Sequence, residues 1–269
     1  MQIIKIKTLI LLITAVLLGF TLPCCQKAES EKDGSLQRVL DKGELVLGLD
    51  ENFPPMGYRD KDGEIIGFDI DLAKEVCGRL GIELICHPID WDKKEELLNA
   101  GEIDCIWNGL SVTDSRKESM LLSEPYLENE LVFVVRKNSP IKSLDDLKGK
   151  KIGVQSGSTT SDVIKEVSVY PDITVIEKGD FLMLLDELKS EELDSVFIDS
   201  MVVYHVAKDS EDFVLLPRSL SDEEIAIAFR KGDMSLKNKV QEILSEMKAD
   251  GRLAEISNEW FGSDITIVR

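Results

Sequence analysis

Short apolar runs alternate with helical patterns along most of the chain. The run Glu44–Leu49 is typical of a buried strand, and the next apolar run spans Ile82–Ile89. Between them, apolar residues recur at helical spacing from Phe68 to Leu80, and Gly81 follows as a suitable left-handed cap. Strand, helix and strand in this order predict a parallel sheet with helices packed on its faces.

The same order returns in the second half of the chain. Apolar runs predict strands, and amphipathic patterns predict helices between them. The strands are expected at 131–135, 151–155, 173–176 and 193–199, and the helices at 144–148 and 181–189. A second α/β unit is therefore expected.

Two segments of the chain match without a gap at a constant offset. One starts at Trp91 and the other at Phe181, each preceded by Asp. In both, the aromatic residue starts a helix, an acidic turn follows, and an Asp leads an apolar strand. Gly109 in the first copy corresponds to Asp199 in the second. The match predicts two similar lobes, with both residues at carboxyl ends of strands.

The chain continues past the second unit with a strand at 224–229 and two apolar-faced helices. We expect this tail to pack back on the first lobe. The predicted fold is α/β, with two similar lobes joined by two crossover strands near Glu130 and Glu224. Lobe 1 is expected to comprise residues 36–130 plus 225–269, and lobe 2 residues 131–224.

The N-terminus has the pattern of an export signal. Lys5 and Lys7 precede the apolar stretch 9–20, which is short for a membrane span. Residues 1–25 are therefore expected to be a signal peptide or lipoprotein leader. The polar segment 26–35 is expected to be a flexible tether.

A pair of cysteines, Cys24 and Cys25, directly follows the apolar stretch. This position predicts lipidation of Cys24 or Cys25 and an extracytoplasmic, membrane-anchored protein. The alternative is a plain signal peptide cut nearby, with both cysteines lost or left in the tail.

Composition narrows the class of protein. The chain has 269 residues and a formal net charge of -19. This charge argues against nucleic-acid binding, because nucleic acids bind clustered Lys and Arg.

The remaining cysteines, Cys77, Cys86 and Cys105, lack metal-ligand spacing and are expected to be free thiols, with a Cys77–Cys86 disulfide as the alternative. His87 and His205 are isolated, so we expect neither a metal nor a cofactor.

The stretch 104–126 carries the first candidate site. Cys105 to Trp107 reads as a strand that ends at Asn108 and Gly109. Thr113 is a suitable N-cap, which places Arg116 in the first turn of the next helix. A guanidinium beside Ser111 and Thr113 hydroxyls can grip a carboxylate. The alternative is that Arg116 is a solvated surface residue.

Three groups can converge in one cleft, namely Arg116, the small polar loop 157–161 and Asp199. A zwitterion needs a cation and donors at one end and an acidic acceptor at the other. The set therefore indicates a site for an amino acid. Phe53 and Trp91 are candidate walls, whereas Trp107 is expected in the core. The chain lacks the glycine motifs of nucleotide sites and any nucleophile elbow, so it is not expected to be an enzyme.

Several segments resemble motifs of the family 3 extracellular solute-binding proteins, the polar amino-acid receptors of ABC importers. They are GFDIDLAKEV (67–76), WNGLSVTDSRKESMLLSEPY (107–126), LDDLKGKKIGVQSGSTT (144–160), ELDSVFID (192–199) and EWFG (259–262). They occur in the family's order and span about Gly43 to Gly262. The resemblance implies two α/β lobes that close on the ligand, which the protein then hands to a membrane permease. It implies a monomer whose partners are a small amino acid and an ABC permease.

The resemblance also implies roles at the two ends of the amino-acid backbone. Arg116 would hold the α-carboxylate, with Ser111 and Thr159 as further donors. Gly109 would offer a backbone group, and Asp199 would take the α-ammonium.

For the ligand's side chain, the resemblance implies a sandwich between Phe53 and Trp91. Asp50 stands where members that bind basic or amide side chains use an acid. Asn108 and Gln155 depart from the usual residues at side-chain-facing positions, so the particular amino acid is left open. Two other functions remain as alternatives, a secreted enzyme similar to cyclohexadienyl dehydratases and a sensor for a membrane signalling partner.

Overall fold

A computed structural model describes residues 33–207, 211–217 and 221–269 of the chain. The predicted leader, most of the predicted tether and the two candidate lipidation sites, Cys24 and Cys25, lie outside these residues. Within the described part, none of the helices combines the length and the apolar character needed to span a membrane.

Ten strands form one mixed sheet, whose main order is β10-β9-β11-β8-β13-β6-β1-β5, with β12 and β7 paired to β8 and β13. Their bounds are β1 (Glu44–Leu49), β5 (Glu83–Pro88), β6 (Cys105–Ser111), β7 (Leu121–Leu122), β8 (Leu127–Arg136), β9 (Lys151–Gln155), β10 (Thr174–Lys178), β11 (Ser195–Asp199), β12 (Phe213–Leu215) and β13 (Ser221–Phe229). Three short strands, β2 (Asn52–Phe53), β3 (Gly57–Arg59) and β4 (Ile65–Ile66), form a small second sheet.

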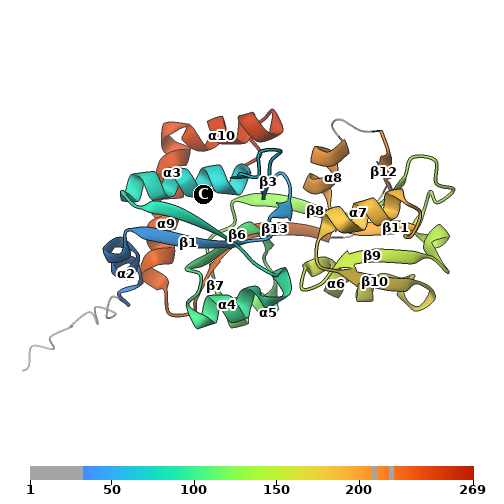
Figure 1. Ribbon diagram of the computed structural model, residues 1–269, viewed down its shortest axis with the longest axis horizontal. Coiled ribbons are helices and arrows are strands. Elements are labelled where there is room, and N and C mark those ends of the chain that lie inside the picture. Colours follow the sequence, from blue (N-terminus) through green and yellow to red (C-terminus); the bar gives the residue numbers. More distant parts are fainter. Residues whose placement is uncertain (1–32, 208–210, 218–220) are drawn as a thin grey trace, which may run out of the picture. The chain divides into compact units, whose positions relative to one another are not determined.

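Helices cover both faces of the main sheet (Figure 1). They are α2 (Ser35–Lys42), α3 (Phe68–Leu80), α4 (Lys94–Ala100), α5 (Asp114–Ser119), α6 (Thr159–Val163), α7 (Phe181–Lys189), α8 (Ser200–Ala207), α9 (Met234–Asp250) and α10 (Arg252–Phe261). The 3-10 helices are η1 (Trp91–Lys93), η2 (Leu144–Leu147), η3 (Ile164–Glu166) and η4 (Tyr170–Asp172).

Strand β1 shows why the sheet is buried on both sides. Leu45, Leu47 and Leu49 pack in the same cluster as residues of α3, α9 and α10, whereas Val46 packs with Leu98 of α4 on the other face. Side chains alternate between the faces of a strand, so a near-continuous apolar run such as β1 needs a cover on each face. The layered α/β fold expected from the sequence is confirmed.

Two strands run through both halves of the main sheet. Strand β8 pairs with β13 over Leu127–Leu131 and with β11 over Leu131–Val134. Strand β13 continues from this pairing to β6, where it pairs over Ile225–Phe229. The two strands are the crossovers between the lobes. The lobe boundaries near residues 130 and 224 stay a prediction.

The expectation that the strand ends at Asn108 and Gly109 is wrong, because β6 continues to Ser111. Gly109 has a φ of 62°, and the register between β6 and β13 shifts at this level. Trp107, Asn108 and Gly109 of β6 stand opposite the single residue Ile227 of β13, after which pairing resumes at Leu110 and Ser111. A glycine in the left-handed region is thus a local irregularity inside the strand.

The cysteines of the described part are free thiols, as expected. Cys77 and Cys105 are buried and Cys86 is half-buried. Burial raises the pKa of each thiol. Thiols held in the neutral form are poor nucleophiles, which agrees with a structural role.

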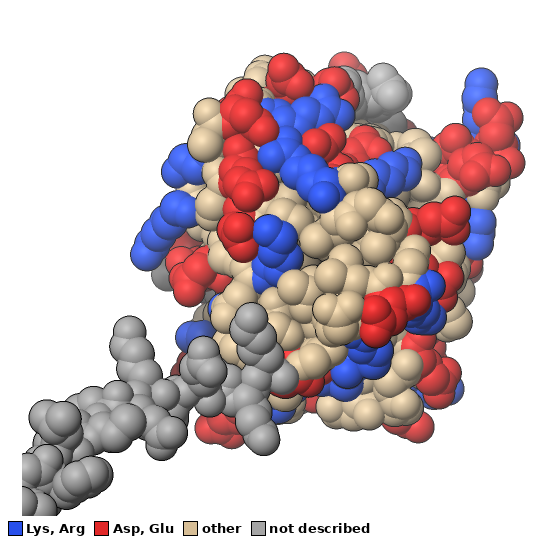
Figure 2. Space-filling model, turned by 90° about the vertical axis from the view of Figure 1, so that its left-hand side faces the viewer, with Lys and Arg blue, Asp and Glu red and all other residues tan. Residues whose placement is uncertain are grey.

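Charges of both signs are interspersed on the face shown in Figure 2, around an area of uncharged residues. Among the ion pairs of α3, α9 and α10, Arg79 pairs with Glu75 and Asp250, and Arg252 pairs with Glu75. The face in Figure 2 carries no continuous basic stripe such as nucleic acids require.

Candidate ligand-binding site

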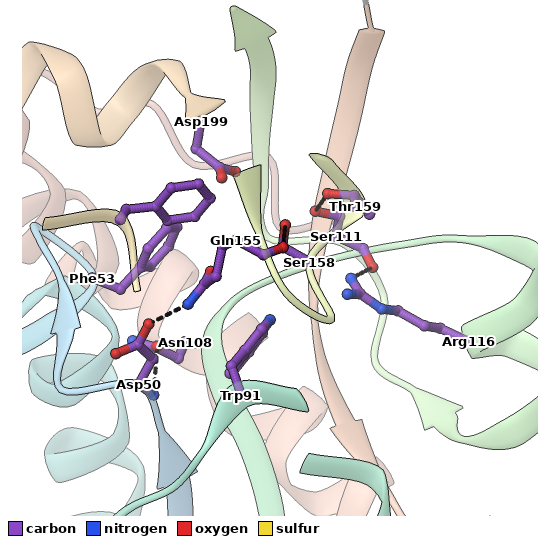
Figure 3. Close-up of a pocket in the computed structure, with 12 residues that line it drawn as sticks. Asp50, Phe53, Trp91, Asn108, Ser111, Arg116, Gln155, Ser158, Thr159 and Asp199 are labelled. Atoms are coloured by element: carbon purple, nitrogen blue, oxygen red, sulfur yellow. Dashed lines mark hydrogen bonds between the residues drawn. The ribbon is translucent and has the colours of Figure 1, made fainter. Parts of the chain in front are cut away.

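One pocket of about 290 Å³ gathers every ligand-binding residue expected from the sequence (Figure 3). Its lining comprises Asp50, Phe53, Trp91, Gly109, Ser111, Arg116, Thr159 and Asp199, together with Asn108, Gln155, Ser158 and Phe181. A pocket with apolar rings and a few convergent polar groups is typical of a site for a small molecule. These residues come from β2, β6, β9 and β11, from the position after β1, and from the starts of η1, α5, α6 and α7.

Arg116 forms one end of the pocket. Thr113 caps α5 by accepting the Arg116 N–H at 3.1 Å, as the sequence predicts. Arg116 is 93% buried, and its guanidinium donates to the Ser111 carbonyl at 2.7 Å and to the Gly157 carbonyl at 3.4 Å. Burial lowers the pKa of Arg116, which nevertheless stays a cation because its ordinary pKa is so high. Because α5 has only six residues, its helix dipole is weak, and the charge of Arg116 contributes more to the positive potential at this end of the pocket.

Two hydroxyl groups lie beside this cation. Ser111 at the end of β6 and Thr159 at the start of α6 place their hydroxyl oxygens 3.2 Å apart. Ser111 also donates to the carboxylate of Glu223 at 3.0 Å. The hydroxyls thus join β6, α6 and the crossover strand β13.

Asp199 ends β11 and supplies the acidic group. Its carboxylate accepts the side-chain N–H of Asn129 at 2.6 Å. Burial and, to a smaller extent, the nearby Glu223 carboxylate raise the pKa of Asp199 to about 8. A carboxyl group held this way gains most from a cation that enters the pocket, because the cation would offset its desolvation.

Asp50 lies at another end of the pocket, directly after β1. Its carboxylate accepts the side-chain N–H of Gln155 at 2.6 Å and the backbone N–H of Asn52 at 2.9 Å. The backbone N–H of Asp50 itself donates to Asn108 at 3.0 Å. Burial raises the pKa of Asp50 to about 6. In Figure 3, Asp50 and Arg116 lie at opposite sides of the view.

Aromatic rings form the apolar walls between these polar ends. Phe53 and Phe181 lie with ring centroids 5.7 Å apart. Trp91, the first residue of η1, is buried, and the ammonium of Lys94 lies 5.1 Å from its ring centroid. Trp107 is fully buried in the core, as expected, and does not line the pocket. Flat apolar rings can cover the methylene part of a polar side chain.

Gly109 is held by a buried carboxyl group behind the pocket. Its backbone N–H donates to Asp69 at 2.7 Å, and the Tyr126 hydroxyl donates to the other oxygen of Asp69 at 2.8 Å. The N–H of Gly109 is therefore engaged, and the backbone group it can offer a ligand is its carbonyl. Burial raises the pKa of Asp69 to about 7.

The substitution Gly109→Ala is expected to cost more stability than Gly101→Ala and to weaken ligand binding. Both glycines have a positive φ, so both variants carry the same backbone strain of about 1 kcal/mol. A Cβ at Gly109 would lie 2.6 Å from a Phe53 ring carbon, whereas a Cβ at Gly101 has no atom within 4 Å. Denaturant unfolding of both variants measures the difference. Equal losses would show that Phe53 can move away without penalty.

Two residues that lie in or beside the pocket were not anticipated as site residues. Phe181 corresponds to Trp91 in the internal match, and the two segments share a helix-capping acid, Asp90 in one and Asp180 in the other. That match could have predicted the second wall. Lys94 is buried and donates to the Gly157 carbonyl at 2.7 Å, so it ties η1 and α4 to the loop before α6. Lysines are seldom buried, and nothing in the sequence pattern marks this one.

The fold, with its two lobes joined by β8 and β13, is that of the type II periplasmic binding proteins. The model of the bacterial extracellular solute-binding proteins, family 3, matches residues 45–263. The chain belongs to this family.

Individual relatives bind different amino acids. The chain is 30% identical to the L-cystine-binding protein TcyJ of Escherichia coli (strain K12), over 87% of this chain and 88% of that protein. It is also 30% identical to the arginine-binding extracellular protein ArtP of Bacillus subtilis (strain 168), over 95% and 98%.

Among solved structures, Tv2483 bound to L-arginine is similar with a TM-score of 0.85 and 32% identity, covering 88% of this chain and 98% of that one. A substrate-binding protein of an ABC uptake transporter from Streptococcus pneumoniae with bound histidine is similar with a TM-score of 0.82 and 34% identity, covering 87% and 98%.

Proposed function

We propose that this protein captures a free polar amino acid outside the cytoplasmic membrane and delivers it to the permease of an ABC importer. One observation carries the proposal, namely that the buried cation of Arg116 and the buried carboxyl group of Asp199 line the same small pocket. Burying either charge alone is costly, and a zwitterion supplies the complement of each. The family membership supports solute capture for an importer.

Four side chains would bind the α-carboxylate and the α-ammonium of the amino acid. Arg116 would hold the α-carboxylate, with the Ser111 and Thr159 hydroxyls as additional donors. Asp199 would accept the α-ammonium. Backbone groups are common to all amino acids, so this end confers affinity for the class and leaves the choice among its members to the other end.

The side chain of the ligand would lie between the rings of Phe53, Trp91 and Phe181 and end at Asp50. A carboxylate that already accepts the Gln155 amide favours a side chain that brings hydrogen-bond donors, and a positive charge adds to the attraction. A basic or amide side chain therefore fits best. Relatives named for arginine, histidine and glutamine support this range, and those named for cystine widen it.

Closure of the two lobes around the ligand would follow from contacts that only the closed form makes. The Gln155–Asp50, Thr159–Ser111 and Lys94–Gly157 contacts each join a residue of the predicted lobe 1 to one of lobe 2. A ligand that touches both lobes shifts the population towards this form. We further propose that the protein acts as a monomer without catalytic activity, anchored by a lipid on Cys24 or Cys25.

Protonation of Asp50 is expected to lower the affinity for L-arginine by about tenfold between pH 7 and pH 5, in addition to the loss that protonation of Asp199 causes. The pKa of Asp50 is about 6 in the pocket. A bound cation lowers it, so below pH 6 the carboxyl group must lose a proton before it can pair with the ligand. Titration calorimetry at several pH values measures the change.

In Asp50→Asn the tenfold contribution of Asp50 is expected to disappear, because the amide does not titrate, whereas the contribution of Asp199 remains. Asp62→Asn, which removes an exposed carboxylate from a nearby turn, serves as the control and should keep both contributions. A dependence in Asp50→Asn equal to that of the wild type would assign the tenfold contribution to another group.

The transport role is tested by uptake. Cells that lack the gene are expected to lose high-affinity uptake of the amino acid that binds the purified protein, and to regain it with the intact gene but not with Arg116→Ala. Undiminished uptake by the deletion strain would separate binding from transport.

A further inference from the structure

Glu223 is a buried acid that does not line the pocket yet contacts several residues that do. It lies in β13, is 92% buried, and pairs in register with Asn129 of β8. Its carboxylate oxygen Oε2 lies 3.0 Å from the Ser111 hydroxyl and 3.3 Å from the side-chain nitrogen of Asn129. The same Asn129 nitrogen donates to Asp199. Two carboxyl groups are thus bridged by one amide.

The hydroxyl groups of this cluster have few hydrogen atoms to donate. A serine or threonine hydroxyl has one hydrogen to donate. If Glu223 is ionised, it can only accept, and it draws the Ser111 hydrogen towards itself and away from the pocket. If Glu223 is neutral, its own hydrogen can be given to Ser111, and the Ser111 and Thr159 hydrogens are then available to a carboxylate in the pocket.

We propose that Glu223 is a positioning residue that, in its neutral form, orients the Ser111 and Thr159 hydroxyls as donors towards the α-carboxylate of the bound amino acid. The inference rests on the proposed function, because it takes the ligand to be an amino acid. Glu223 does not touch the ligand and acts through the two hydroxyls.

The balance of charge supports the neutral form. With an amino acid of neutral side chain bound, the positive charges of Arg116, Lys94 and the α-ammonium match the negative charges of the α-carboxylate, Asp199 and Asp50. An ionised Glu223 would add an uncompensated buried charge.

Other acids around Glu223 also favour its neutral form. Glu128 and Glu130 lie on β8, and Asp222 and Glu224 lie on β13, where Asp222 is opposite Glu130 and Glu224 is opposite Glu128. Their charges oppose ionisation of Glu223, whereas the facing Arg116 of α5 favours it. Burial is the largest influence and raises the pKa of Glu223. Burial therefore favours the neutral form of Glu223.

Ligand binding by the wild type should then weaken at high pH, and this weakening should depend on Glu223. As pH rises, Glu223 loses its proton, the hydroxyl hydrogens turn back towards it, and the α-carboxylate loses its donors. In Glu223→Gln the amide keeps donating hydrogens to the hydroxyls at every pH. Glu224→Gln removes the same charge from the next residue of β13, whose side chain is exposed, and serves as the matched control.

The test is titration calorimetry of wild type, Glu223→Gln and Glu224→Gln at pH 6 and pH 9. The probe is whichever of L-arginine, L-histidine, L-glutamine and L-cystine binds the wild type. The probe's own ionisation is common to all three proteins and cancels in the ratio of their Kd values. We expect wild type and Glu223→Gln to agree within about threefold at pH 6, and the wild type to bind about tenfold more weakly than Glu223→Gln at pH 9. Glu224→Gln should follow the wild type.

Three results would overturn the proposal. They are a wild-type to Glu223→Gln ratio of Kd values that does not change with pH, a Glu223→Gln protein that binds at least tenfold more weakly than the wild type at both pH values, and a Glu224→Gln protein that, like Glu223→Gln, binds more tightly than the wild type at pH 9. Thermal melting first checks that each variant is folded.

If Glu223→Gln does not fold, Ser111→Ala replaces it. That variant should lose less affinity than the wild type between pH 6 and pH 9, and an equal loss would overturn the proposal. If none of the four probes binds the wild type, it is the proposed function that fails.

Discussion

Replacing Arg116 by Ala is expected to weaken amino-acid binding by at least ~30-fold, because removing one partner of a buried, hydrogen-bonded charge pair costs about 2 kcal/mol or more. Arg116 is 93% buried, and the Ser111 and Gly157 carbonyls hold its guanidinium in place. The lost energy therefore includes both the ion pair and the fixed geometry of its donors. Titration calorimetry with the preferred amino acid measures the effect.

A matched control lies at the next position. Lys117 is exposed, so Lys117→Ala removes a positive charge from the same helix and should change affinity by less than about twofold. Arg116→Lys keeps the charge but not the planar pair of donors, and we expect it to bind between the wild type and Arg116→Ala. An Arg116→Ala protein that binds within threefold of the wild type would remove Arg116 from the carboxylate site.

Asp199→Asn is expected to weaken binding by at least ~30-fold, through loss of the charge that meets the α-ammonium. The amide oxygen can still accept the Asn129 N–H, so the fold around it should be retained. Asp186→Asn, at an exposed position of α7, is the charge-matched control. Unchanged affinity, with a des-amino analogue preferred over the amino acid, would contradict the ammonium assignment.

In the absence of ligand, Asp199→Asn should be more stable than the wild type, and the difference in the free energy of unfolding should grow with pH. The pKa of Asp199 is about 8 in the folded protein, above the ordinary value of 3.8. The folded state therefore binds more protons than the unfolded state between about pH 4 and pH 8, and the wild type loses stability over that range as pH rises. Melting curves of both proteins at pH 5 and pH 9 show whether the gap widens. A constant gap would mean that Asp199 is ionised without cost.

Elements with a strong local signal were predictable from the sequence. The helix expected at 181–189 is α7 with the same bounds, and Gly81 and Gly251 cap α3 and α9 in the left-handed conformation. Each of these signals depends on neighbouring residues only. The course of β6 through Gly109 was not predictable in the same way, because it depends on Asp69, which is 40 positions away and accepts the Gly109 N–H. A glycine in sequence cannot be recognised as a strand residue when its conformation is fixed by a distant carboxyl group.

The candidate site could be predicted to the extent that its residues follow strands. Arg116, Thr159 and Asp199 stand directly after buried runs, where the ends of parallel strands meet, and all three line the pocket. Glu223 and Lys94 could not be inferred. One is an acid within a strand rich in acids and the other a lysine in a charged helix, and a solvated surface explains both patterns equally well. Only packing against Ser111 and Gly157 distinguishes them.

The central claim is that the pocket holds a free polar amino acid. A thermal-shift screen tests it most directly, using protein that has been unfolded in denaturant and refolded to remove bound ligand, against the twenty amino acids and cystine. At a hundred times its Kd, a ligand adds about 2.7 kcal/mol to stability, which raises Tm by about 5 to 10 °C in a protein of this size. We expect such a shift with one or a few polar amino acids, most of all those with basic or amide side chains. A folded protein that shows no shift with any of them would contradict the claim.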